Sequence, residues 1–241
     1  MTPRAILLDI EGTTTRIAFV HDVLFPFARV RLGAFLERAR DTPAVGLVLT
    51  LLVAEHLSDR QRGESPPPLE LRDGSPSRAS AVGYLEWLMD RDRKSPALKD
   101  LQGLIREDGY RAGALTGEVF PDVAPAIRRW RAAGIDVAIY SSGSELAQRL
   151  LFGSTPEGDL TPLLSGFFDT RVGAKSDAAS YARIAAALGH TPADVLFLSD
   201  VTAELDAARE AGADTVLVTR PVNSQMMSGL HRVVASFDQV L

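Results

Sequence analysis

The 241-residue sequence contains no cysteine. Disulfide bonds, thiolate zinc sites and cysteine nucleophiles are therefore excluded. The sequence also lacks an apolar run of the ~20 residues that a membrane-spanning helix needs, because its longest run, residues 45–54, is short and is interrupted by Thr50. Near the amino terminus, Asp9 places a charge where a signal peptide would be apolar. We therefore expect a cytoplasmic protein without a membrane partner.

An excess of positive charge is missing as well. The 26 basic and 31 acidic residues give a net charge of −5, which provides no electrostatic footprint for nucleic acid. Hydrophobic residues make up 46% and charged residues 24%, the usual mix for a globular protein with a sizeable core. The length predicts one domain, or one domain that carries a smaller inserted one.

Most of the sequence alternates between strand and helix patterns. The apolar run 5–10 predicts a strand buried on both faces of a parallel sheet. The β-α-β rhythm that follows predicts an α/β fold with a doubly wound parallel sheet and right-handed crossovers. We expect further strands at 137–140, 167–169, 195–198 and 215–218, and helices at 123–133, 178–188 and 203–211. A further helix should run to residue 152, and Ser142 with Glu145 can cap its start.

Residues 16–118 interrupt this rhythm. Apolar residues recur at helical spacing over 23–40, 44–56, 79–90 and 97–106, and no segment of this block is typical of a strand. Residues 65–78 are rich in proline and polar side chains, which predicts a loop. A helical block between the first strand and the remainder of a sheet predicts an inserted helical cap domain over 16–118, on a core formed by 1–15 and 119–241.

Polar side chains that can carry out chemistry follow the expected strands. They are Asp9 and Glu11 after the first strand, Ser141 and Ser142 after the second, Lys175 near the third, and Ser199, Asp200 and Glu204 after the fourth. Because ligands of open parallel sheets bind beyond the carboxyl ends of the strands, we expect these groups to converge. Each could by itself serve only as a helix cap or turn former. Their joint placement favours a common site.

This set of groups suits phosphoryl transfer. Carboxylates are the oxygen ligands that Mg²⁺ prefers, and an aspartate can attack phosphorus to form an acyl phosphate that water then hydrolyses. A metal ion and a lysine can offset the repulsion between the attacking carboxylate and the phosphate. The sequence therefore predicts a Mg²⁺-dependent phosphatase with a small phosphorylated substrate and Asp9 as nucleophile.

The motifs resemble those of a known family. They are DIEGTT at 9–14, DRKSPALKDLQG at 92–103, IYSSGSELAQRLLFG at 139–153, FFDTRVGAK at 167–175, FLSDVTAELDAAREAG at 197–212 and RPVN at 220–223. Over nearly its whole length the sequence is similar to the enolase-phosphatase E1 branch of the haloacid dehalogenase-like phosphatases, in which glutamate replaces the usual second aspartate of the first motif. Two positions depart from that branch: Arg106, where we expect tryptophan, and Val222, where glycine is usual.

The resemblance implies a HAD-like Rossmannoid core with a helical cap, a bound Mg²⁺ and a monomer of the methionine salvage pathway. It implies that 2,3-diketo-5-methylthiopentyl-1-phosphate is enolised and then dephosphorylated to the acireductone 1,2-dihydroxy-3-keto-5-methylthiopentene. By this resemblance the catalytic residues are Asp9, Glu11 and Lys175, the metal-associated residues are Asp9, Glu11 and Asp200, and the substrate-binding residues are Ser141, Ser142 and Lys175. Glu11 would reach the metal through its backbone carbonyl.

Three other readings stay open at this point. The protein could be a phosphatase of the same superfamily that acts on another small phosphomonoester. It could be a non-enzymatic phospho-acceptor domain, which combines the same groups but lacks a large helical insertion and a group that speeds hydrolysis. It could also be an inactive binding protein, although every required group is present.

Overall fold

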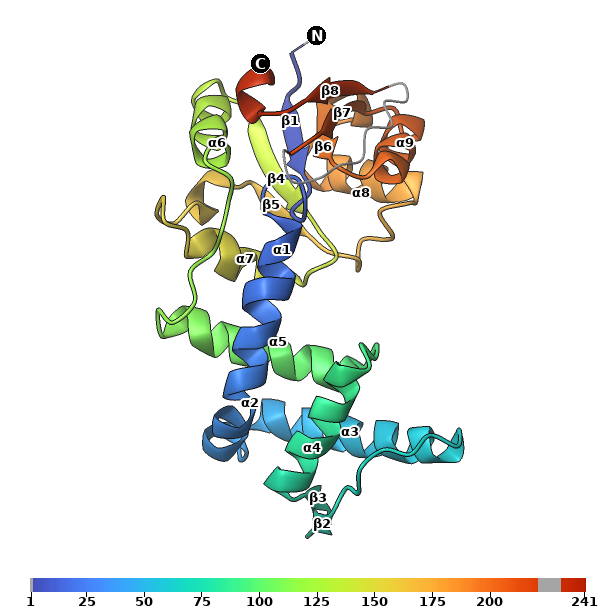
Figure 1. Cartoon of the computed structure of the whole chain (residues 1–241). Coiled ribbons are helices and arrows are strands. Elements are labelled where there is room, and N and C mark those ends of the chain that lie inside the picture. The colour runs from blue at the N-terminus through green and yellow to red at the C-terminus, as the bar shows by residue number, and fades with distance from the viewer. Residues whose placement is uncertain (1, 221–230) are drawn as a thin grey trace. The chain divides into compact units, whose positions relative to one another are not determined.

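The computed structural model describes residues 2–220 and 231–241. It divides into two compact units, one formed by Met1–Phe19 with Gly113–Leu241 and the other by Val20–Ala112 (Figure 1). The sequence placed these divisions a few residues away, after residues 15 and 118. Val222, one of the two departures from the family pattern, lies outside the described residues. Across the described ranges, no helix has both the length and the apolar character needed to cross a membrane.

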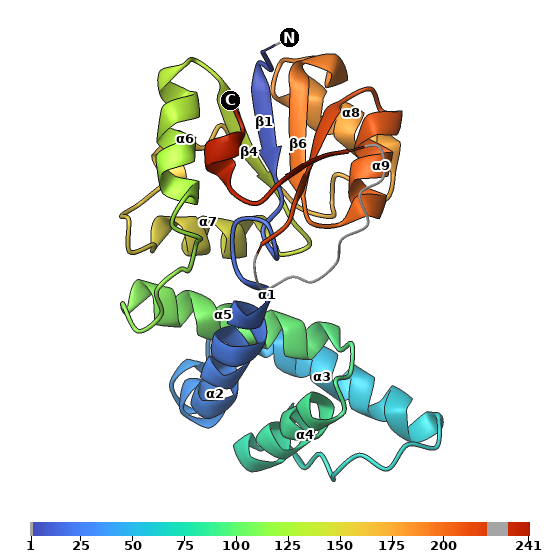
Figure 2. The same cartoon turned by 45° about the horizontal axis from the view of Figure 1, so that its top comes forward.

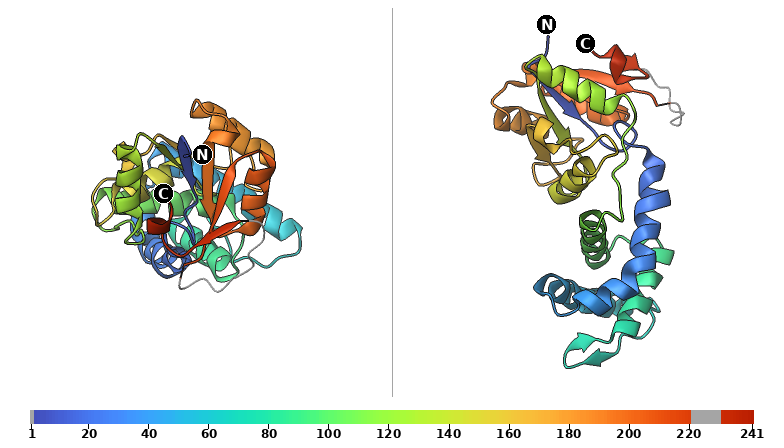
Figure 3. Two further views of the ribbon diagram at one scale, coloured as in Figure 1. Left: turned by 90° about the horizontal axis from the view of Figure 1, so that it is seen from above. Right: turned by 90° about the vertical axis from the view of Figure 1, so that its left-hand side faces the viewer.

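A six-stranded parallel sheet forms the centre of the first unit within the described residues. Its strands, in spatial order, are β5 (Gly166–Phe168), β4 (Asp136–Tyr140), β1 (Ala5–Leu8), β6 (Val195–Ser199), β7 (Asp214–Val218) and β8 (Arg232–Val234). Figure 3 shows the central strand β1 beside β6 in its left view. The five strands expected from the sequence are confirmed. Strand β8 was not expected from the sequence.

Helices flank this sheet on both sides, as the α/β prediction required (Figure 2). Helices α8 (Ala178–Ala187) and α9 (Thr202–Glu210) pack on one face, where Ile184 and Leu205 meet Leu7 and Phe197 in a buried cluster. Helix α6 (Val123–Ala132) packs against β4, and its Trp130 contacts the ring of residue 237 in η4 (Phe237–Gln239). All four residues of β1 are buried, which explains its unbroken apolar run. The remaining short helices are α1 (Ile17–Phe19), η2 (Thr161–Leu163) and η3 (Pro192–Asp194).

The second unit is helical, as expected. Its elements are the π-helical turn η1 (Val20–Leu24) and the helices α2 (Phe25–Ala39), α3 (Pro43–Gln61), α4 (Arg78–Asp90) and α5 (Pro96–Arg111). The side chains of Thr42, Ser77 and Ser95 cap the starts of α3, α4 and α5 by accepting backbone N–H groups. Leucines 52, 85 and 101 are fully buried in the core that these helices share.

Two local expectations are wrong. The block thought to lack strands contains an antiparallel pair, β2 (Leu71–Arg72) with β3 (Ser75–Pro76), whose two-residue strands are too short to show alternation. Helix α7 (Glu145–Gly153) is capped by Ser144 instead of Ser142: the Ser144 hydroxyl accepts from the Ala147 N–H at 3.3 Å. Glu145 is the first helical residue, and its N–H donates to Asp169 at 3.3 Å. Ser142 is therefore left in the loop that precedes the helix.

Candidate active site

Three strands end together at the carboxyl edge of the sheet. Leu8 at the end of β1 is level with residue 139 of β4 and residue 198 of β6. The residues that follow therefore leave the sheet side by side: Asp9 after β1, Ser141 after β4 and Asp200 after β6. The register of the parallel strands thus brings groups that are about 60 to 190 positions apart in the sequence to one edge.

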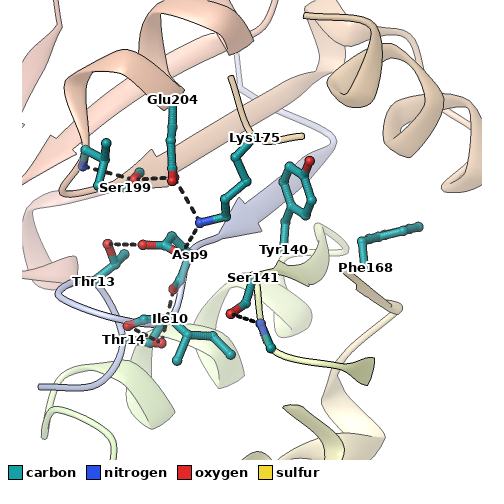
Figure 4. Close-up of polar contacts among 12 residues, drawn as sticks. Asp9, Ile10, Thr13, Thr14, Tyr140, Ser141, Phe168, Lys175, Ser199 and Glu204 are labelled. Carbon is teal, nitrogen blue, oxygen red and sulfur yellow. Dashed lines mark hydrogen bonds and ion pairs between the residues drawn. The ribbon is translucent and has the colours of Figure 1, made fainter. Parts of the chain in front are cut away.

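The Lys175 ammonium joins two carboxylates at this edge (Figure 4). It forms an ion pair with Asp9 Oδ1 and donates to Glu204 Oε2 at 2.9 Å. The Ser199 hydroxyl also donates to Glu204 Oε2, at 3.0 Å. Asp9 is only 4% exposed. Asp9 and Lys175, which the sequence predicted to converge at one edge of the sheet, are therefore in contact.

A tight turn after β1 holds Asp9. The Thr14 hydroxyl donates to the Asp9 carbonyl at 3.1 Å, and the Thr13 hydroxyl lies 3.4 Å from Asp9 Oδ2. Gly12 takes a φ of 80°, a conformation that favours glycine. Glu11 lies on this turn with an exposed side chain. The backbone of the turn thereby places both expected acid groups of the first motif.

The loop that carries Lys175 is held by three hydroxyl groups. The successive carbonyls of residues 173, 174 and 175 accept from Tyr140 at 2.9 Å, Ser180 at 2.9 Å and Tyr181 at 2.7 Å. Gly173 has a φ of 139°, and a Cβ there would lie 2.1 Å from the Ser180 hydroxyl oxygen. Glycine is thus required for the loop to come this close to α8.

The loop after β4 is fixed in a similar way. Ser141 is buried, its N–H donates to the Phe168 carbonyl at 3.1 Å, and its hydroxyl oxygen accepts from the Gly143 N–H at 3.2 Å. The buried Gln148 amide donates to the Gly143 and Phe168 carbonyls, both at 2.8 Å. Figure 4 shows Ser141 next to the segment that begins with Asp9. Ser142 follows on the same loop with an exposed side chain.

The site carries more negative than positive charge. Burial raises the pKa of Asp9 to about 7; Lys175 opposes this shift, whereas Glu204 and Asp200 add to it. Burial also raises the pKa of Asp200 to about 6, and Glu204 and Glu11 contribute to the increase. Burial lowers the pKa of Lys175, but Asp9 and Glu204 outweigh it, so that the net shift is upward. The Lys175 ammonium therefore contacts two carboxylates, those of Asp9 and Glu204, and Asp200 and Glu11 add further negative charge nearby.

This donor set fits a divalent cation. The raised pKa values of Asp9 and Asp200 indicate that both carboxylates would be stabilised by additional positive charge. Within the described ranges, no three His, Asp or Glu side chains form a metal-binding cage. An ion of the Mg²⁺ type does not need one, because it binds through one or two carboxylates together with substrate phosphate and water. Asp9, Asp200 and the backbone near Glu11 are the groups that would hold it.

The structure therefore brings together most of the residues proposed from the sequence. Asp9, Lys175 and Asp200 influence one another electrostatically, and Glu11 and Ser141 lie on the adjoining loops. Glu204 was recognised only as an acid one turn beyond Asp200, without a role. Gln148 and Tyr181 were missed, because their contacts are to backbone carbonyls that no sequence pattern identifies.

The chain is similar to known proteins over nearly its whole length. Residues 3–212 match the family model of the haloacid dehalogenase-like hydrolases. Enolase-phosphatase E1 of Synechococcus elongatus is 50% identical to this chain over 236 residues, which cover 98% of this chain and 96% of that protein. The chain belongs to the enolase-phosphatase E1 family. Enolase-phosphatase E1 of an Enterobacter species is 47% identical over 237 residues, with coverage of 98% and 96%.

A solved structure is also similar to this chain. The crystal structure of the UTR4 protein from Saccharomyces cerevisiae matches with a TM-score of 0.78 and 32% identity, covering 98% of this chain and 99% of that one. The resemblance inferred from the motifs is therefore confirmed, and the chain is a phosphatase with the haloacid dehalogenase-like fold. Enzymes of this class generally depend on a divalent metal, in keeping with the charge balance of the site.

Proposed function

We propose that the protein is a bifunctional enolase-phosphatase. It converts 2,3-diketo-5-methylthiopentyl-1-phosphate to 1,2-dihydroxy-3-keto-5-methylthiopentene and phosphate, with Mg²⁺ as its cation. The name of the relatives supports both activities. The observation that supports the phosphatase step most strongly is the buried Asp9 in contact with Lys175, beside Asp200 and at the carboxyl edge of the sheet.

Asp9 is the proposed nucleophile of the dephosphorylation. Its carboxylate oxygen bonds to phosphorus while the bond between phosphorus and the ester oxygen breaks, and Glu11 gives its proton to the leaving oxygen. The resulting Glu11 carboxylate then takes a proton from water as the water oxygen attacks phosphorus, which releases phosphate and regenerates Asp9. Lys175 and the Ser141 hydroxyl hold the phosphoryl oxygens.

A bound Mg²⁺ would offset the negative charge of the phosphoryl group. We propose Asp9, Asp200 and the Glu11 backbone carbonyl as its protein ligands. Titration calorimetry tests this directly: we expect Mg²⁺ to bind the native protein, and Asp200→Asn to weaken binding by at least tenfold while the protein stays folded. Unchanged affinity in that variant would contradict the assignment of Asp200.

Enolisation precedes dephosphorylation and is a separate proton transfer. A proton leaves the carbon that carries the phosphate ester, and the oxygen of the neighbouring carbonyl gains one. We propose that Glu11 takes part in this step, because its side chain is exposed at the turn and is one methylene longer than the aspartate usual at this position. Glu11→Gln should then lose both reactions. Full enolisation by that variant would exclude Glu11 from the first step, and Glu157→Gln, an exposed acid of the same unit, is the control.

The substrate is tested by turnover of the purified native protein with Mg²⁺. We expect many turnovers of the diketo phosphate, with enol absorbance appearing before free phosphate, and far lower kcat/KM for a panel of sugar phosphates. Higher kcat/KM for a sugar phosphate would instead favour another phosphomonoesterase. Release of no more than one equivalent of phosphate would favour the phospho-acceptor reading.

We further propose that the helical unit, residues 20–112, is the inserted cap domain, and that the protein acts as a cytoplasmic monomer without nucleic-acid or membrane partners. The net charge of −5 supports the absence of a polyanionic partner. Sedimentation equilibrium should give the mass of a single chain, and a mass twice as large would contradict the monomer.

A further inference from the structure

Arg220 is a buried cation in contact with the turn that carries Asp9 and Glu11. It follows β7, is 4% exposed, and lies 207 positions from Thr13 in the sequence. Its Nε and one terminal nitrogen both donate to the Thr13 carbonyl, at 2.9 and 2.8 Å. The RPVN motif that begins with this arginine has no part in the chemistry proposed above.

The guanidinium is itself held from several directions. Its other terminal nitrogen donates to Asp122 at 2.7 Å, and Asp122 also accepts from the Phe237 N–H at 2.6 Å and the Ser236 hydroxyl at 3.1 Å. The rings of Phe120 and Phe237 lie 4.2 and 4.7 Å from the centre of the guanidinium. A cation fixed in this way can act as an anchor for the turn instead of following its motion.

The carbonyl that Arg220 holds belongs to a peptide group central to the turn. The N–H of the same peptide, from Thr14, donates to the Ile10 carbonyl at 2.9 Å. The Thr13 side chain in turn lies 3.4 Å from Asp9 Oδ2. Both ends of this peptide are therefore fixed, and with them the backbone from Asp9 to Thr13.

Arg220 reaches Asp9 through the geometry of the turn. The largest effects of neighbouring charges on the pKa of Asp9 come from Lys175, Glu204 and Asp200. The charge of Arg220 is matched by Asp122, and it reaches the turn through a neutral carbonyl.

We propose that Arg220 is a positioning residue, which sets the turn 9–14 so that Asp9 is aligned for attack and Glu11 for proton transfer; this rests on the function proposed above. A guanidinium can donate to Asp122 and twice to one carbonyl at once, whereas the ammonium of a lysine is a point charge on a flexible stem. Misplacement of reacting groups by about 1 Å can cost roughly 100-fold in rate.

The test compares two variants with the native enzyme. Arg220→Lys preserves a cation for Asp122 but removes the paired contact with Thr13. We expect a folded protein whose kcat is roughly 10- to 100-fold lower, with KM nearly unchanged because Lys175 and Ser141 are intact. Amide hydrogen exchange of a peptide spanning residues 10–15, followed by mass spectrometry, should become faster. Ser236→Ala removes a hydrogen bond to Asp122 but no contact with Thr13. It should leave kcat and the exchange rate of the turn at native values.

Several outcomes overturn the proposal: native kcat in Arg220→Lys, a lower kcat without faster exchange of the turn, or equal losses in Ser236→Ala. If Arg220→Lys fails to fold, Arg220→Gln decides, because its neutral side-chain amide can donate to the Thr13 carbonyl through one nitrogen at most. Faster exchange of the turn and a lower kcat in Arg220→Gln support the proposal, and native values of both overturn it. The exchange comparison holds even if the native protein fails to turn over the diketo phosphate, so the two failures are distinguishable.

Discussion

The Lys175 ammonium donates a hydrogen bond to the Glu204 carboxylate across 2.9 Å. The same ammonium also pairs with Asp9, the proposed nucleophile. Lys175 therefore lies between Asp9 and Glu204, and Glu204 forms no bond to the substrate in the proposed mechanism. Glu204 also accepts from the Ser199 hydroxyl at 3.0 Å, which restricts where its carboxylate can lie. In the mechanism proposed above, Glu204 would therefore orient the Lys175 ammonium toward the phosphoryl group.

Replacing Glu204 should lower the rate more than the affinity. Glu204→Gln keeps the size of the side chain but removes the charge that orients Lys175, so we expect kcat to fall roughly 10- to 100-fold, the range for misplaced catalytic groups. Steady-state kinetics on the diketo phosphate would measure this. Glu210→Gln, at the exposed end of the same helix, should match the native enzyme. Native kcat in Glu204→Gln would show that Lys175 needs no second acid.

The Tyr181 hydroxyl should support activity through the Lys175 backbone. Tyr181→Phe removes only the donor to the Lys175 carbonyl and leaves this partly buried acceptor unpaired. The change should lower stability by about 1 kcal/mol and kcat by a few fold. Tyr110→Phe is a matched control, because the buried Tyr110 hydroxyl has no hydrogen-bond partner among the residues described. Urea denaturation would measure stability, and steady-state kinetics would measure kcat. Equal stability and equal kcat in Tyr181→Phe and Tyr110→Phe would refute the role of Tyr181.

Asp136 should make stability depend on pH. Hydrogen bonds from Ser165 and His190, with help from Arg131, lower the pKa of Asp136 to about 2. A carboxyl group whose pKa is lower in the folded than in the unfolded protein stabilises the folded state at pH values above the unfolded pKa of about 3.9. This stabilisation is lost as the pH falls toward the folded pKa of about 2. The side chain is 34% exposed, so solvent screening limits the contribution to about 1 kcal/mol.

Urea denaturation of Asp136→Asn at two pH values tests this dependence. The variant should be less stable than the native protein at pH 7, and the difference should narrow at pH 3. Asp214→Asn is the control, because Asp214 also begins a strand of the sheet but is exposed. A difference that is constant from pH 7 to pH 3 would contradict the lowered pKa.

Features that depend on short stretches of sequence could be predicted. The buried strand before Asp9 follows from an unbroken apolar run, and the site follows from the rule that groups after parallel strands share an edge. Lys175 was placed only approximately, because it lies seven positions after the end of β5 and its loop is fixed by hydroxyls from β4 and α8.

Features that depend on distant contacts could not be predicted. Arg220 contacts Thr13 across 207 positions of sequence. The acceptor is a backbone carbonyl, which every residue has, so the amino-acid type at position 13 does not indicate the contact. The cap of α7 was misplaced because Ser142 and Ser144 are both good capping residues, and the contact of the Glu145 N–H with Asp169 helps to fix the helix start.

Transfer of the phosphoryl group to Asp9 is the central claim, and trapping the phospho-enzyme tests it most directly. Acid quenching during turnover, followed by borohydride reduction and peptide mass spectrometry, would convert an acyl phosphate on Asp9 to homoserine. We predict homoserine at position 9 in the native enzyme, and none in Asp9→Asn, whose kcat should be lower by about 10⁴-fold or more. Label at another residue, or rapid turnover without a modified Asp9, would contradict the covalent mechanism.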